Sequence, residues 1–82
     1  MSGSVIDVDE LERAILDAHE QNDAGRLAQL YHQAFEHKFS LGEVNASAFL
    51  LTQAYVFALE SGHDSASALQ KKLIELGREQ SI

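Results

Sequence analysis

The stretch VNASAFLLTQAYVFALES, residues 44–61, decides the fold of this chain. On a helical wheel, one side of it carries Ala48, Leu51, Tyr55 and Leu59. Leu50 and Phe57 lie seven residues apart and share the opposite side. A helix with apolar residues on both sides is stable only when neighbours cover both of them. We therefore expect a helix from near Val44 to Ser61 at the centre of a helical domain.

Apolar residues recur with helical spacing before and after this central stretch. The spacing predicts one helix over residues 8–21, a second over residues 24–39 and a last helix that ends at Gly77. Turns of about two to five residues make consecutive helices antiparallel. The predicted fold is all-α, with four antiparallel helices that form two stacked helical hairpins.

Residues suited to helix ends stand at the breaks in the apolar pattern. Asp7, Asp23 and Asp64 each precede a predicted helix, where a short carboxylate accepts hydrogen bonds from free backbone amides. Gly62 follows the central helix and is expected to close it in the left-handed conformation.

Length and composition restrict the chain to one small domain. Its 82 residues are 45% hydrophobic and 23% charged, a balance typical of a folded protein. We expect a single domain over residues 1–82 with an ordered core over about residues 8–78. So short a chain has no room for a barrel enzyme or a doubly wound nucleotide-binding fold.

The net charge excludes two classes of partner. Thirteen acidic and six basic side chains give a formal net charge of −7 at pH 7, and such a field repels phosphate backbones and anionic lipid. We therefore expect neither nucleic acid nor a membrane as partner. The chain has no cysteine, and its N-terminus lacks the basic start and apolar core of a signal peptide. These features predict a cytoplasmic protein.

The two predicted hairpins resemble tetratricopeptide-type helical repeats. The positions that resemble the first hairpin of that family are Leu11, Ala14, Ile15, Ala18, Asn22, Asp23, Leu27, Tyr31 and Ala34. In the second hairpin, the corresponding positions are Ala54, Tyr55, Ala58 and Gly62. No single gapless period relates the two halves, so convergent hairpin packing is the alternative.

This resemblance implies a protein–protein interaction module without catalytic activity. Repeats of this type offer a groove lined by the first and third helices, so Glu12, Leu16, His19 and Glu20 would face a protein or peptide partner. Acidic residues among them favour a basic or amphipathic ligand.

A second resemblance rests on a short segment. Gly62-His63-Asp64-Ser65, followed by Ala68 and Leu69, resembles the Asp-Ser attachment site of acyl and peptidyl carrier proteins. That resemblance implies phosphopantetheine on Ser65. The simpler interpretation is that Asp64 and Ser65 begin the last helix, because both are ordinary capping residues. We expect no cofactor.

The histidines do not form a motif for metal binding. His32 and Glu36 lie four residues apart and His37 follows. This His-x-x-x-Glu-His segment is one residue longer than the inverted zinc-protease motif. We therefore expect surface histidines and no metal, and no catalytic residues.

The apolar back of the central helix suggests self-association. If only two neighbours cover this helix, Leu50 and Phe57 remain partly exposed, and a symmetric homodimer would bury them.

Overall fold

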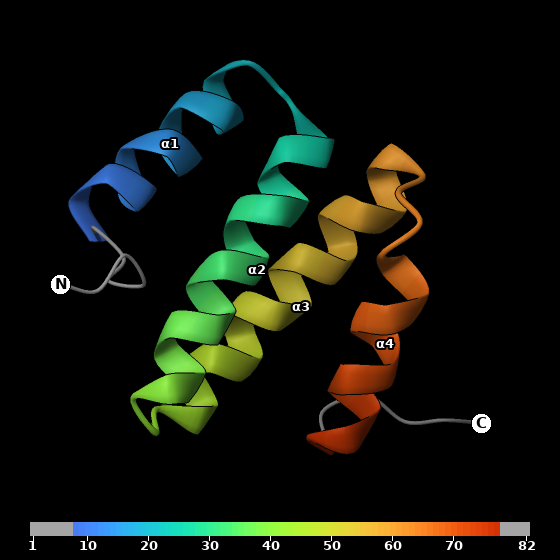
Figure 1. Cartoon of the computed structure of the whole chain (residues 1–82). Helices are drawn as coiled ribbons and strands as arrows, with labels where there is room; N and C mark the ends of the chain where they lie inside the picture. Colours follow the sequence, from blue (N-terminus) through green and yellow to red (C-terminus); the bar gives the residue numbers. More distant parts are fainter. Residues whose placement is uncertain (1–7, 78–82) are drawn as a thin grey trace, which may run out of the picture.

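Four α-helices make up the described part, residues 8–77, of this computed structural model. They are α1 (Val8–Glu20), α2 (Ala24–Ser40), α3 (Val44–Ser61) and α4 (Ala66–Glu75). Figure 1 shows that each helix runs antiparallel to the next. No strand occurs within residues 8–77. The all-α fold of four helices in two hairpins is confirmed, and the helix boundaries fall within two residues of those expected.

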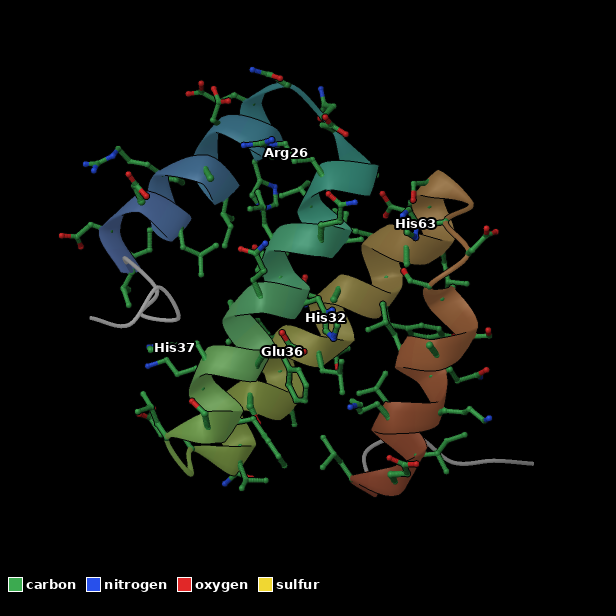
Figure 2. All side chains as sticks on the ribbon, in the orientation of Figure 1. Arg26, His32, Glu36, His37 and His63 are labelled. Atoms are coloured by element: carbon green, nitrogen blue, oxygen red, sulfur yellow. The ribbon has the colours of Figure 1, made fainter. Side chains whose placement is uncertain are left out.

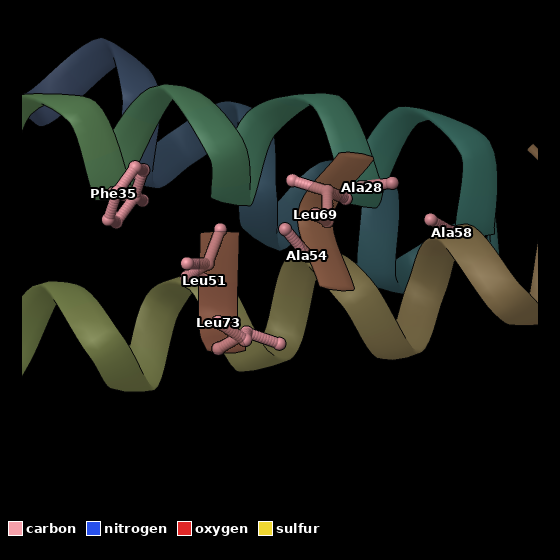
Figure 3. Close-up of a cluster of buried hydrophobic side chains, with 7 residues drawn as sticks. All are labelled: Ala28, Phe35, Leu51, Ala54, Ala58, Leu69 and Leu73. Carbon is pink, nitrogen blue, oxygen red and sulfur yellow. The ribbon is translucent and has the colours of Figure 1, made fainter. Parts of the chain in front are cut away.

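The long helices α2 and α3 form the centre of the fold. α4 packs against one side of this pair and α1 against the other (Figure 1). Figure 3 shows the larger core cluster, to which α2, α3 and α4 contribute Ala28, Phe35, Leu51, Ala54, Ala58, Leu69 and Leu73. A smaller cluster of Ala18, Leu27 and Leu30 joins α1 to α2. Helix α3 is therefore central, as the sequence predicts.

The buried side of α3 is rotated from the side that the helical wheel suggested. Its buried residues are Ser47, Ala48, Leu51, Ala54 and Ala58. Most of these are small, which lets neighbouring helices approach closely. Tyr55 is only half-buried and Leu59 is 55% exposed, so the expectation that Leu59 shares a buried side was wrong. Sequence periodicity found the helix but misplaced the centre of its contact surface.

The first three helices end in the same way. Asn22, Gly42 and Gly62 follow them at intervals of twenty residues and have φ angles of 54°, 80° and 68°. In each case the amide of the next residue donates back to a carbonyl of the last helical turn, at 2.9 to 3.1 Å. This arrangement satisfies carbonyl groups that would otherwise lack partners. The predicted left-handed position of Gly62 is confirmed.

The predicted N-terminal caps have different outcomes. The Asp23 side chain accepts a hydrogen bond of 3.1 Å from the Arg26 amide, as expected. Asp64 does not cap α4, because the turn after Gly62 places Ser65 at the N-cap instead. The Ser65 amide donates to Nδ1 of His63 at 3.1 Å. Asp7 lies outside the described residues.

Candidate functional site

Two hollows lie beside α1, both are lined by residues of α1 and α2, and α3 contributes only Leu50, to the first of them. One hollow of about 150 Å³ is lined by Val8, Leu11, Glu12, Ile15, Ala34, His37, Lys38 and Leu50. A second, of about 300 Å³, is lined by Glu12, Ile15, Leu16 and Tyr31. The two hollows share Glu12 and Ile15, so they adjoin each other, and together we call them the α1–α3 groove.

The groove exists because α1 covers α2 only in part. Ala18 is the one fully buried residue of α1, whereas Leu11 and Ile15 are half-buried against α2. Leu16 points outward and is 64% exposed. Figure 1 shows α1 and α2 diverging from the turn that connects them. Apolar surface of α1 thus remains available beside the small Ala34 of α2.

Three aromatic rings from three helices meet at the end of the groove nearest the α1–α2 turn. Tyr31 stacks on Phe57 with ring centroids 5.7 Å apart. His19 meets both rings edge-on, at 5.9 Å from Tyr31 and 5.6 Å from Phe57. His19 Nε2 also shares a hydrogen bond of 3.0 Å with the Tyr31 hydroxyl. Such aromatic pairs favour defined geometry, so this cluster holds α1, α2 and α3 in register.

Burial raises the pKa of the Tyr31 hydroxyl above its ordinary value. The hydroxyl therefore stays protonated to a higher pH than that of an ordinary tyrosine, and it remains a partner for His19. A third, smaller hollow of about 110 Å³ lies beyond the aromatic cluster and is lined by His19, Asn22, Ala24, Leu27, Phe57 and Glu60.

The charges along the groove are unevenly placed. Glu12 lies at the junction of the two hollows and is exposed. The one lysine of the lining, Lys38, lies 3.3 Å from Glu43 Oε1 through its Nζ atom. An ion pair of this kind offsets the lysine charge locally. The groove therefore offers apolar surface with a carboxylate shared by its two hollows.

Five of the six partner-binding residues expected from the sequence surround this groove. Glu12, Leu16 and Leu50 line its hollows. His19 and Phe57 belong to the aromatic cluster at its end. Glu20 is exposed at the last residue of α1 and lines none of the hollows described above. The sequence pattern identified Leu11, Ile15 and Tyr31 only as positions of the first hairpin, so they were missed as groove residues. No sequence signal marks their half-burial.

The histidine-rich part of α2 has a structural explanation. His32 Nε2 lies 3.8 Å from Glu36 Oε2, and its ring stacks on Phe35. Figure 2 shows His37 on a different side of α2 from His32 and Glu36. Within residues 8–77, no group of three or more histidine or acidic side chains is placed to hold a metal ion.

Ser65, the candidate for phosphopantetheine attachment, lies at the N-cap of α4. It is half-buried, and its Oγ atom lies 2.8 Å from Nδ1 of His63. Both side chains belong to the turn between α3 and α4, which Figure 2 shows at the end of α3. The Ser65 hydroxyl and amide are thus both hydrogen-bonded within this turn.

A further cleft lies between α2 and α4. It has a volume of about 420 Å³ and is lined by Phe35, Glu36, Phe39, Ser40, Lys72, Glu75 and Leu76. Phe39 is 47% exposed here, with its ring centroid 5.5 Å from that of Phe35. Phe39 therefore extends the core cluster outward at this end of the molecule.

Comparisons with protein-family models, with curated proteins and with solved structures find no match to this chain. Within the described residues, no helix is both long and apolar enough to cross a membrane.

Proposed function

We propose that this chain is a non-catalytic protein–protein interaction module whose α1–α3 groove binds a peptide or helix of a partner protein. The observation that carries the proposal is the groove itself, a largely apolar surface with Glu12 shared by its two hollows. Grooves of this shape accept the apolar side of an amphipathic helix. The likeness to tetratricopeptide-type hairpins supports the same function, and the cysteine-free composition is consistent with a cytoplasmic setting.

The lining indicates which ligand would fit. Leu11, Ile15 and Leu16 offer apolar contacts along one wall. Glu12 lies among them and favours a lysine or arginine beside the apolar residues of the ligand. The net charge of −7 would also accelerate the approach of a basic segment. The partner is therefore an amphipathic helix with basic residues flanking its apolar side.

A selection from a random peptide library displayed on phage tests this proposal. Selected peptides are expected to combine apolar residues at helical spacing with lysine or arginine. Glu12→Lys should weaken their binding about tenfold, because it replaces attraction by repulsion. Glu20→Lys makes the same change of charge on the same helix outside the lining, and it should leave the affinity within about twofold. Fluorescence anisotropy with labelled peptides gives both values.

A second pair of variants tests the apolar contacts. Leu16→Asp alters a residue of the groove, whereas Leu41→Asp alters a residue of similar exposure at the α2–α3 turn. Only Leu16→Asp should reduce binding. Equal binding by the wild type, Glu12→Lys and Leu16→Asp would contradict the proposal.

The carrier-protein alternative predicts a different result. Co-expression with a phosphopantetheinyl transferase would then add the mass of phosphopantetheine to the chain, and Ser65→Ala would abolish the addition. We expect the intact mass to remain unchanged.

A further inference from the structure

The outward side of α3 exposes large apolar residues that no other helix of the described chain covers. Phe49 is 63% exposed, Val56 39% and Leu59 55%. Thr52 is exposed between them. We call these four residues the α3 seam. They lie on the side of α3 away from Leu51, Ala54 and Ala58, which pack in the core.

The four seam residues are spaced along the sequence like the contact residues of two packed helices. Phe49 and Val56 are seven residues apart, and Thr52 and Leu59 each follow three residues later. These intervals match the a and d positions of a heptad, which point toward a neighbouring helix. The seam is separate from the α1–α3 groove, because Leu50 and Phe57 project from α3 roughly 90° or more around the helix from it. The natural occupant of the seam is therefore another helix.

The charge of the chain indicates that the helix on the seam comes from a second copy of the chain. From Val44 to Leu59, α3 contains no charged residue, although the chain carries a net charge of −7. In a two-fold dimer each surface meets its own copy, so an acidic surface would repel itself. α1, by contrast, carries Asp9, Glu10, Glu12, Asp17 and Glu20. The seam offers two acidic copies a place to meet without opposed carboxylates.

We propose that two copies of this chain form a dimer in which their α3 helices pack antiparallel through the seam. With the two-fold axis on the seam side of α3, at the level of residue 54 along the helix, Phe49 packs on Leu59 of the partner subunit and Thr52 packs on Val56 of the partner subunit. All four seam residues then have apolar or compact partners, with a positions opposite d positions, as antiparallel helix pairs require.

The acidic residue at the end of the seam favours this orientation. Glu60 is the one charged residue within α3. In a parallel pair the two copies of Glu60 would lie side by side. In the antiparallel pair each lies opposite Ala48 of the partner subunit, about 18 Å along the helix axis from the other copy's Glu60. Because the seam is short and the interface therefore small, we expect a dissociation constant of the dimer in the micromolar range.

Sedimentation equilibrium across micromolar to millimolar concentrations tests the dimer. The mass should rise from the 9.0 kDa of one chain toward twice that value. Val56→Glu should weaken the dimer at least tenfold. Leu16→Glu changes a residue of similar character in the groove, and it should leave the association unchanged. A monomer at every concentration, or loss of the dimer with Leu16→Glu but not with Val56→Glu, would overturn the proposal.

A charge-pair experiment tests the orientation. Phe49→Glu and Leu59→Lys, each alone, should weaken association, whereas one chain with both substitutions should dimerise again and do so less in high salt. That recovery requires residue 49 to face residue 59 of the partner subunit. A parallel pair would bring the two introduced glutamates together, and failure of the double variant to recover would therefore refute the antiparallel arrangement. Circular dichroism verifies that each variant keeps its helices, as the exposure of these positions predicts.

Discussion

Tyr31 links the stability of the fold to alkaline pH. Burial raises the pKa of its hydroxyl in the folded state. A tyrosine of the unfolded chain ionises near about pH 10. Between that pH and the higher pKa of the folded state, only the unfolded chain releases this proton. The free energy of unfolding should therefore fall as the pH rises through this window. Below it the hydroxyl is protonated in both states and contributes no pH dependence.

Urea unfolding between about pH 8 and pH 11 measures this slope. Tyr31→Phe removes the ionisable group and should flatten the curve relative to the wild type. Identical slopes in the wild type and Tyr31→Phe would show that the hydroxyl is not desolvated in solution.

The end of α3 depends on the backbone conformation of one glycine, Gly62. Gly62 has a φ of +68°, a conformation that disfavours every residue with a Cβ atom. Gly62→Ala should lower the free energy of unfolding by about 1 to 2 kcal/mol. No neighbouring atom lies within 4 Å of the added Cβ, so the loss would come from the backbone alone.

Gly25 supplies the opposite case within α2. A Cβ atom there would make only ordinary contacts at 3.9 Å, with Asp23 and Ser61. Gly25→Ala should raise the stability by up to about 0.5 to 1 kcal/mol, because alanine favours the helix. Thermal or urea unfolding of both variants gives the comparison. A stability change of the same sign in both would contradict the assigned backbone conformations.

Sequence analysis predicted the elements well because their signals are local. Helical spacing and the residues at helix ends depend on neighbours in the chain, and Asp23 and Gly62 occupy the expected positions. The prediction that Asp64 caps α4 was wrong, because Asp64 and Ser65 are equally suitable N-cap residues and the path of the turn decides between them. The resemblance implied a groove lined by the first and third helices, and no sequence signal showed that α1 and α2 supply most of the lining, since the half-burial of Ile15 and Tyr31 depends on how α1 leans on α2. Tertiary packing also selects which side of a nearly all-apolar helix is buried. The exposure of Phe49 therefore could not be predicted from the sequence.

Most of the buried residues belong to the α2–α3 pair. Each of these helices has five buried residues, whereas α4 has two and α1 has one. Helices with few buried contacts open locally without unfolding the remainder of a domain. We therefore expect α1 to separate from the α2–α3 pair more often than the molecule unfolds as a whole.

Native-state hydrogen exchange measures this order directly. Amides in the middle of α2 and α3 should exchange slowest, at the rate set by global unfolding, and those of α1 at least about tenfold faster. Ala18→Leu would enlarge the one fully buried residue of α1 and push α1 outward, so its amides should lose protection while α3 keeps its own. Uniform protection across all four helices would instead mean that α1 and the α2–α3 pair unfold as one unit, and that the groove between them is as rigid as the core.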